Sequence, residues 1–395
     1  MKDIDIKVIK GLGEDFIFGM DASEVLAEER SGVVYYNYDG EVQDVFETLA
    51  QSGINYIRLR VWNDPYDESG NGYGGANTDI DTAIELGRRA TKYGMKVCID
   101  FHYSDFWADP NRQLSPKAWQ HMSPDEKASA VYAFTKENLI KALDAGVDVT
   151  MVQVGNEINN GMSGETDVKV VATLLKEGSL AVREVAKLYD RDIEVALHYT
   201  LIKDAEGIDR IASDLKKDDV DYDIFGMSYY PMWDGTNENM QAVTRNIIEN
   251  YGKKAMIAET SYCFTTESGD GFKNAFVGDE NLVEGYDATV QGQASIIRDI
   301  CEAAYEAGST GVFYWGGTWV PVKKYDKALP DAEEVLESNR QKWEKYGSGW
   351  ACKCVGAYDE FSRNYGGSEW CNQAMFDFDG HPLESLKVFK YMREQ

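Results

Sequence analysis

Eight short apolar segments, each followed by a segment with helical periodicity, repeat from one end of the chain to the other. Segments that are apolar at nearly every position are typical of parallel strands, because both faces of a parallel sheet are covered. Eight such strand and helix units close most economically into a barrel. The sequence therefore predicts an α/β protein with a single (β/α)8 TIM-barrel domain over residues 1–395. The expected strands are 16–21, 55–61, 96–102, 149–155, 193–198, 224–229, 255–259 and 311–315.

The expected helices begin and end at recognisable signals. Ser123 and Pro124 form a helix start before the periodic segment 125–145, and the segment 79–93 has a similar apolar spacing. A glycine just before the next strand supplies the left-handed cap that a short connection needs, and such glycines are Gly94, Gly146, Gly252 and Gly308. The alternative fold, a doubly wound open sheet, would carry a Gly-rich phosphate loop after its first strand, and this sequence has none there.

The chain is strongly acidic, with 40 Lys and Arg residues against 68 Asp and Glu residues and a formal net charge of -28. Such a charge repels the phosphate backbone of nucleic acids and disfavours polyanionic glycans, whereas a neutral sugar polymer meets no electrostatic penalty. The sequence also lacks an apolar run long enough to cross a membrane. We therefore expect a monomer whose partner is a neutral polysaccharide or oligosaccharide, with no nucleic acid and no membrane.

Polar and aromatic residues end the expected strands, and that end of a TIM barrel carries the active site. Two carboxylates that flank a glycosidic bond suffice for its hydrolysis. Glu157 and Glu259 end strands four and seven, which nearly face each other around a small barrel. We expect Asn156 to bind the sugar 2-hydroxyl, and either Tyr229 or Tyr230 to keep Glu259 ionised. The strand-end residues are Asp21, Arg58, Arg60, Asp100, His102, Asn156, Glu157, His198, Tyr229, Tyr230, Glu259 and Trp315.

Aromatic rings stack well on the apolar faces of sugars, and the chain contains nine tryptophans. Six lie in or beside segments that follow strands, and we expect them to bind substrate: Trp62, Trp107, Trp233, Trp315, Trp319 and Trp350. The other three are expected to pack in the interior: Trp119, Trp343 and Trp370. The expected substrate-binding site also contains Asp21, Arg58, Asp100, His102, Asn156, His198, Tyr229 and Tyr230.

Seven stretches resemble the arabinogalactan endo-β-1,4-galactanases of glycoside hydrolase family 53, and the resemblance covers nearly the whole chain. The stretches are Asn-Tyr-Ile-Arg-Leu-Arg-Val-Trp-Asn-Asp-Pro at 55–65, Gly-Tyr-Gly-Gly at 72–75, Asp-Phe-His-Tyr-Ser-Asp-Phe-Trp-Ala-Asp-Pro at 100–110, Gln-Val-Gly-Asn-Glu-Ile-Asn-Asn-Gly at 153–161, Ser-Tyr-Tyr-Pro-Met-Trp at 228–233, Ala-Glu-Thr-Ser at 258–261 and Asn-Gln-Ala-Met-Phe-Asp-Phe-Asp-Gly-His-Pro at 372–382. The resemblance implies a retaining endo-hydrolase of β-1,4-galactan, the side chain of type I arabinogalactan. It also implies that Glu157 is the acid/base and Glu259 the nucleophile.

One departure from the family pattern lies after the eighth strand, where Trp315-Gly-Gly-Thr-Trp319 lacks the acid and the proline of the family's Trp-Glu-Pro-Ala-Trp. Two other functions stay open. A related retaining barrel enzyme could act on another neutral β-linked glycan, such as a xylan, mannan or glucan, because strand-end carboxylates fit these equally well. A catalytically silent glycan-binding relative would have a replaced carboxylate, and neither Glu157 nor Glu259 is replaced.

A second departure concerns the loops after strands seven and eight, both expected to be long, the first at 263–287. In some bacterial members of the family, calcium ties these loops together. Phe272 and Cys371 replace two of the ligands and offer no hard oxygen, so we expect no cofactor and no bound calcium. Apolar contact, or a disulfide from Cys371 to Cys352 or Cys354 in an oxidising compartment, would tie the loops instead. The degenerate calcium-like positions that remain are Asp270, Asn274 and Ser368.

Two further expectations concern the cysteines and the cellular location. Six cysteines allow 15 pairings that sequence does not choose between. Cys98 lies in an apolar strand and Cys301 in a helix, so both are expected to be reduced core residues. The segment 1–10 alternates charged and apolar residues without a signal peptide, which predicts a cytoplasmic location for the chain as given, or an extracellular one if a leader has been removed.

Overall fold

Eight parallel strands pair in chain order and close into a barrel in the computed structural model, which describes residues 4–276, 278, 282–360, 362 and 365–393. The first strand pairs with both the second and the eighth, so the sheet is closed. This confirms the predicted barrel and excludes an open sheet. The strands are β1 (Ile17–Asp21), β2 (Tyr56–Val61), β3 (Lys96–Phe101), β4 (Val149–Val154), β5 (Glu194–Tyr199), β6 (Ile224–Ser228), β7 (Lys254–Thr260) and β8 (Gly311–Tyr314).

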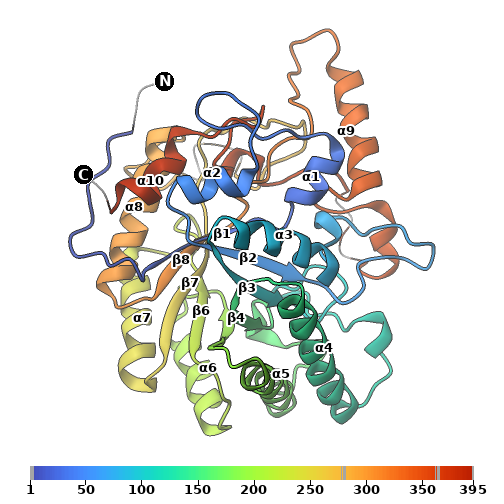
Figure 1. Ribbon diagram of the computed structural model, residues 1–395, viewed down its shortest axis with the longest axis vertical. Helices are drawn as coiled ribbons and strands as arrows, with labels where there is room; N and C mark the ends of the chain where they lie inside the picture. Colours follow the sequence, from blue (N-terminus) through green and yellow to red (C-terminus); the bar gives the residue numbers. More distant parts are fainter. Residues whose placement is uncertain (1–3, 277, 279–281, 361, 363–364, 394–395) are drawn as a thin grey trace.

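Helices surround the barrel, because the chain must cross back over the outside of the sheet between parallel strands (Figure 1). The predicted start signal is confirmed, since Ser123 and Glu126 form a reciprocal capping box there. All four predicted cap glycines are left-handed, with φ between 65° and 86°. The helices are α1 (Val25–Ser31), α2 (Val45–Gln51), α3 (Ile80–Lys92), α4 (Pro124–Asp144), α5 (Val168–Tyr189), α6 (Ala205–Lys217), α7 (Asn237–Tyr251), α8 (Val290–Glu306), α9 (Ala332–Tyr346) and α10 (Val388–Tyr391).

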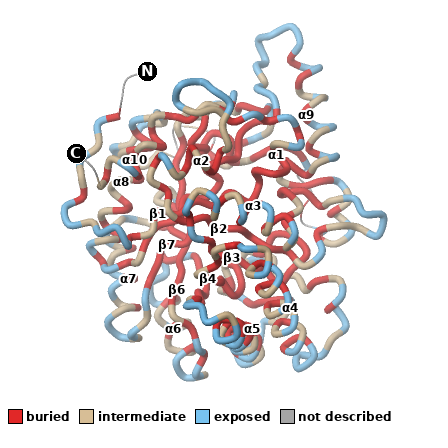
Figure 2. Tube along the Cα trace, viewed as in Figure 1, coloured by how far each residue is buried: buried red, intermediate tan, exposed pale blue. Residues whose placement is uncertain are grey.

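Buried residues fill the centre of the molecule, and exposed ones lie on its outer helices and loops (Figure 2). All six positions of β2 are buried, as expected for a strand covered on both faces. Side chains such as Tyr56, Met151 and Phe313 fill the inside of the barrel, and a larger apolar layer separates the strands from the helices. The barrel is therefore packed rather than hollow, and a ligand must bind at one of its ends.

Other expectations meet the structure with different outcomes. Cys98 and Cys301 are free and fully buried, as predicted. Within the described part of the chain, no helix has the length and apolar composition that a membrane crossing needs. Residues 1–3 of the segment 1–10, and residues 277 and 279–281 of the expected loop 263–287, lie outside the described residues.

Candidate active site

A cleft of about 490 Å³ lies at the carboxyl ends of the strands. Most of the residues expected at the site meet there, although they come from segments far apart in the sequence. The closed barrel brings them together because the ends of all its strands form one ring. Those lining the cleft are Asp21, Arg58, Asp100, His102, Trp107, Asn156, Glu157, Tyr230, Trp233, Glu259, Trp315 and Trp350.

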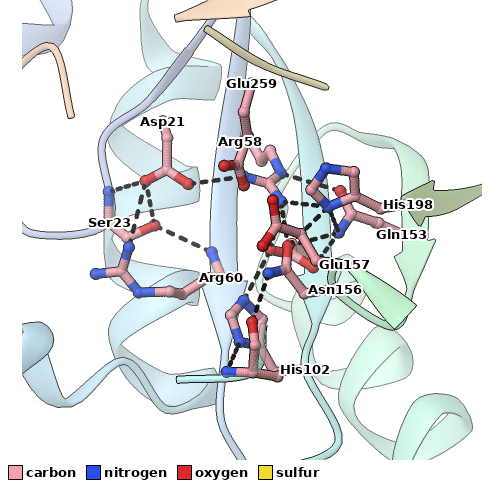
Figure 3. Close-up of polar contacts among 12 residues, drawn as sticks. Asp21, Ser23, Arg58, Arg60, His102, Gln153, Asn156, Glu157, His198 and Glu259 are labelled. Atoms are coloured by element: carbon pink, nitrogen blue, oxygen red, sulfur yellow. Dashed lines mark hydrogen bonds and ion pairs between the residues drawn. The ribbon is translucent and has the colours of Figure 1, made fainter. Parts of the chain in front are cut away.

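Arg58, on β2, is the buried cation at the centre of the site (Figure 3). Its guanidinium lies 2.8 Å from Glu259, 2.9 Å from Asp100 and 3.4 Å from Asp21, with 1% of the side chain exposed. Burial opposes the ionised form of Asp100, but Arg58 and His102 outweigh this and lower the pKa of that carboxyl. Arg58 therefore holds several acidic groups in one small buried space.

Glu259, near the end of β7, is held from two sides. Arg58 Nη1 donates to its Oε1 at 2.8 Å, and the Tyr230 hydroxyl donates to its Oε2 at 2.9 Å. Burial raises the pKa of Glu259, whereas Arg58 and Tyr230 oppose that rise. Of the two tyrosines considered, Tyr230 contacts the carboxylate. The Tyr229 hydroxyl instead donates to Gly235 O and Asn237 Oδ1.

Glu157 follows β4 in a sharp turn. Its φ is 46°, in the left-handed region that costs energy for a residue with a side chain, and it directly precedes the 3-10 turn Ile158–Asn160. Its Oε1 lies 2.7 Å from Ser228 Oγ, and Thr200 is a second hydrogen-bond partner. Burial, and next the nearby charge of Glu259, raise the pKa of Glu157 to about 8. Both effects favour the protonated form of this carboxyl group.

A network of buried polar side chains holds Arg58 and the carboxylates around it in place. Asn156 Oδ1 accepts from Arg58 Nη2 at 2.8 Å, and its Nδ2 donates to Ala108 O at 2.8 Å. Gln153 Oε1 accepts from Arg58 Nε at 3.0 Å, and its Nε2 donates to Asp100 Oδ1 at 2.6 Å. Hydrogen bonds thus join the ends of several strands. The side-chain amides of Gln153 and Asn156 determine which group donates and which accepts in each bond.

Tryptophans form one wall of the cleft. The rings of Trp107 and Trp350 stack with their centroids 4.5 Å apart, and Trp315 meets Trp370 edge to face at 4.8 Å. Trp233 is 45% exposed at the cleft, and its ring packs against Tyr230. These rings present apolar surface at a polar site, which suits the faces of sugar rings.

Four residues expected to bind substrate are completely or almost completely buried and lie behind the cleft wall. Trp62 donates to His102 Nδ1 and packs edge-on against Trp107, so it supports rings that do line the cleft. Trp319 donates to Ser348 O and stacks behind Trp107 and Trp350. The other two are Tyr229 and His198, and His198 lies 2.8 Å from Asn156 Oδ1.

Several residues that contribute to the site were not among the substrate-binding residues expected from sequence. Trp370, expected in the interior, lines the cleft, and Thr200 does so as well. Arg60 lies with its guanidinium carbon 4.2 Å from the centre of the Trp107 ring. Its position at a strand end was a usable signal, because alternate residues of one strand point to the same side. Ser228 lies at the end of β6, and this strand-end position could likewise have indicated a place in the site.

The side chains at the degenerate calcium-like positions hydrogen-bond to neighbouring groups of the protein. Asp270 Oδ1 accepts from Phe272 N and its Oδ2 from Ser368 N, both at 2.8 Å, so backbone groups occupy both oxygens. The Cys371 thiol donates to Asn274 Oδ1 at 3.3 Å. Among the described residues, no group of three or more His, Cys, Asp or Glu side chains is placed to hold a metal ion. Hydrogen bonds therefore tie the loops after β7 and β8 together.

The disulfide considered for Cys371 is not formed. All six cysteines of the chain fall within the described residues and are free. The thiol of Cys352 donates to Trp343 O at 3.2 Å and that of Cys354 to Gly72 O at 3.1 Å, whereas Cys371 faces Asn274. Of the two ties considered, the disulfide is therefore absent, whereas apolar contact is present, because the Phe272 ring meets Trp343 edge to face with 6.4 Å between the centroids.

Comparison with known proteins identifies the family of the chain. Residues 17–389 match the sequence model of Glycosyl hydrolase family 53. The chain is 48% identical over 394 residues to the endo-beta-1,4-galactanase of Bacillus subtilis, which covers 99% of this chain and 89% of that protein. It is 31% identical over 318 residues to the arabinogalactan endo-beta-1,4-galactanase of Cellvibrio japonicus, covering 78% and 82% of the two chains. The solved GH53 catalytic domain of Ignisphaera aggregans superposes with a TM-score of 0.86 at 37% identity, covering 99% of this chain and 100% of that one. The chain therefore belongs to glycosyl hydrolase family 53 and is a glycoside hydrolase.

Proposed function

We propose that the protein is an endo-hydrolase of β-1,4-galactan that works by a retaining double displacement with Glu157 as acid/base and Glu259 as nucleophile. The observation that carries this assignment is the difference between the two carboxyl environments. Burial and the charge of Glu259 favour the protonated form of Glu157, whereas Arg58 and Tyr230 stabilise the ionised form of Glu259. Two carboxyl groups whose surroundings separate their protonation states are typical of an acid and nucleophile pair.

In the first step, Glu259 attacks the anomeric carbon while Glu157 gives its proton to the departing oxygen, so a covalent glycosyl-enzyme forms and the chain end leaves. In the second step, the ionised Glu157 takes a proton from water, which attacks the anomeric carbon and releases Glu259. Arg58 and Tyr230 hold the Glu259 carboxylate in place for the attack. Asn156 lines the same cleft directly before Glu157 and is suited to bind the sugar 2-hydroxyl.

The substrate class follows from the cleft and from the relatives. The wall of Trp107, Trp315, Trp350 and Trp370 gives apolar platforms for several sugar rings. The net charge of -28 favours a neutral polymer over a polyanionic one. The relatives from Bacillus subtilis and Cellvibrio japonicus are named as endo-beta-1,4-galactanases, and these observations together support β-1,4-galactan as the substrate.

The test is digestion of a panel of linear glycans, namely β-1,4-galactan, xylan, mannan and β-glucan, with analysis of the released oligosaccharides over time. We expect oligosaccharides of intermediate length from galactan at early times, as an endo-hydrolase produces. Protein with Glu259→Gln, purified in the same way, controls for a contaminating hydrolase. Release from xylan, mannan or glucan with galactan left intact would favour the alternative substrate class and contradict the proposal.

A further inference from the structure

The contact between His198 and Asn156 fixes the position of one proton. Asn156 Nδ2 donates to Ala108 O, and its Oδ1 accepts from Arg58 Nη2, both at 2.8 Å, so the orientation of the amide is determined. The oxygen of this amide therefore faces His198 Nδ1, at 2.8 Å. An amide oxygen only accepts hydrogen bonds. This short contact is favourable only if His198 Nδ1 carries the hydrogen.

Two nitrogen donors also lie near His198 Nδ1, but both are engaged elsewhere. Gln153 Nε2 is 3.2 Å from Nδ1, and it donates at shorter distances to Asp100 Oδ1 at 2.6 Å and to Gly155 O at 3.0 Å. Arg58 Nη2 is 3.5 Å from Nδ1 but lies 2.9 Å from Asp100 Oδ2. Their hydrogens are used by these closer oxygens, so Nδ1 has no need to act as an acceptor.

The proton on Nδ1 sets the direction of the next two hydrogen bonds. Burial, and next the charge of Arg58, lower the pKa of His198 far below its usual value, so the ring is neutral and Nε2 carries a lone pair. Ser228 Oγ lies 2.9 Å from this Nε2 and donates its single hydrogen to it. Ser228 Oγ lies 2.7 Å from Glu157 Oε1 and donates to it when that carboxylate is ionised. With the Ser228 hydrogen on His198 and Glu157 protonated, Ser228 Oγ accepts from Glu157 instead.

We propose that His198 and Ser228 are positioning residues that form a directional hydrogen-bond chain, which holds the proton on Glu157 and thereby makes that group the proton donor. The role of Glu157 in this statement rests on the proposed function. When Glu157 gives up its proton, Ser228 turns its O–H bond from His198 to the new carboxylate, and His198 Nε2 loses its donor. When Glu157 takes a proton from water, Ser228 turns back. His198 keeps its Nδ1 proton throughout.

Charged and titratable groups from several elements face this chain. Those that act on Glu157 are Glu259 on β7 and Asp109 in the loop after β3. Those that act on His198 are Arg58 on β2, Asp100 on β3 and His102, which directly follows β3. Asp100 favours a charged imidazole, whereas Arg58 and His102 disfavour it, and burial dominates. Burial and these surrounding charges together keep the His198 ring neutral.

Nitrogen NMR of the full chain labelled with 15N-histidine tests the proton position without any substrate. The chain has only four histidines, and Ser228→Ala identifies the resonances that belong to His198. We expect His198 to be neutral with its hydrogen on Nδ1, and its Nε2 resonance to shift as Glu157 titrates because Ser228 turns away. In Ser228→Ala this shift should disappear. A hydrogen on Nε2 at all pH values would overturn the proposal.

The pH dependence of kcat/KM tests the consequence for Glu157. In His198→Leu, Ser228 no longer has an imidazole acceptor and is free to donate to the Glu157 carboxylate. The alkaline limb should therefore move to lower pH by about 0.5–1 unit, which is what one hydrogen bond is worth. His121→Leu, an exposed histidine, is the control and should leave the limb in place. An unmoved or raised limb in folded His198→Leu would refute the inference. Absence of activity toward galactan in the unaltered protein would refute the proposed function instead. The NMR experiment would still report the position of the His198 proton in that case.

Discussion

Arg58 is a buried cation shared by three carboxylates, and its replacement by methionine should destabilise the fold strongly. The guanidinium lies within 3.4 Å of Asp21, Asp100 and Glu259 and is 1% exposed. Removing one partner from a buried ion cluster typically costs about 3–5 kcal/mol, because charges remain without compensation. We expect Arg58→Met to lower the free energy of unfolding at pH 7 by about this amount.

The loss should depend on pH with a definite sign. In the unaltered protein, Asp100 has a lowered pKa, so it contributes stability above its unfolded pKa that is lost as pH falls through the folded value. In Arg58→Met, the same carboxyl loses its cation and its pKa rises, so protonation in mild acid relieves the strain. The difference in stability between the two proteins should therefore shrink as the pH falls from 7 toward 4.

Urea unfolding followed by tryptophan fluorescence measures this difference. Arg89→Met is a matched control, because Arg89 also contacts two carboxylates, Glu29 and Asp44, but its side chain is 21% exposed. Exposed ion pairs are screened by solvent and contribute little, so this control should lose only about 1 kcal/mol. Equal losses in the two variants, or a loss in Arg58→Met that does not change with pH, would refute the reasoning about the buried cluster.

Three further predictions concern activity and metal dependence. Glu157→Gln should lower kcat on galactan by about 10²–10⁴-fold, and Glu259→Gln should lower it by roughly 10³-fold or more. An aryl galactoside with a good leaving group should partly restore the activity of Glu157→Gln but not that of Glu259→Gln. Near-normal turnover in either variant would contradict the assigned roles. The alkaline limb of kcat/KM should lie near pH 8, because the active protonated form of Glu157 is lost as pH rises through its pKa of about 8; a limb two units lower would show that another group controls it. EDTA should leave the melting temperature and activity unchanged, because backbone groups occupy both oxygens of Asp270, and a drop of several degrees that calcium restores would reveal a metal site.

Much of the fold could be predicted because its signals are local. Largely apolar strands recur in every unit and left-handed glycines precede several of them, and each of these signals depends only on a few neighbouring residues. The expected strand 193–198 is observed at Glu194–Tyr199, and the expected helix 79–93 at Ile80–Lys92, with Asp79 as its cap. Shifts of one residue arise because the ends of helices and strands are set by caps and by pairing with the next strand.

The site could be predicted in its location but not in its contacts. Strand ends placed Glu157 and Glu259 in one cleft, because the closed barrel brings all the strand ends together. Whether Tyr229 or Tyr230 contacts Glu259 depends on the direction in which each side chain points after the end of β6. The sequence does not determine that direction for two adjacent tyrosines. Trp370 reaches the cleft through a contact with Trp315, and no local pattern encodes contacts between segments so far apart in the chain.

The most direct test of the central claim is proton NMR of the anomeric configuration of the products released from β-1,4-galactan during the first moments of digestion. A double displacement through Glu259 inverts the anomeric carbon twice. We therefore expect the β-anomer to appear first and the α-anomer to form later by mutarotation. Initial appearance of the α-anomer would show a single displacement by water and would contradict the role assigned to Glu259.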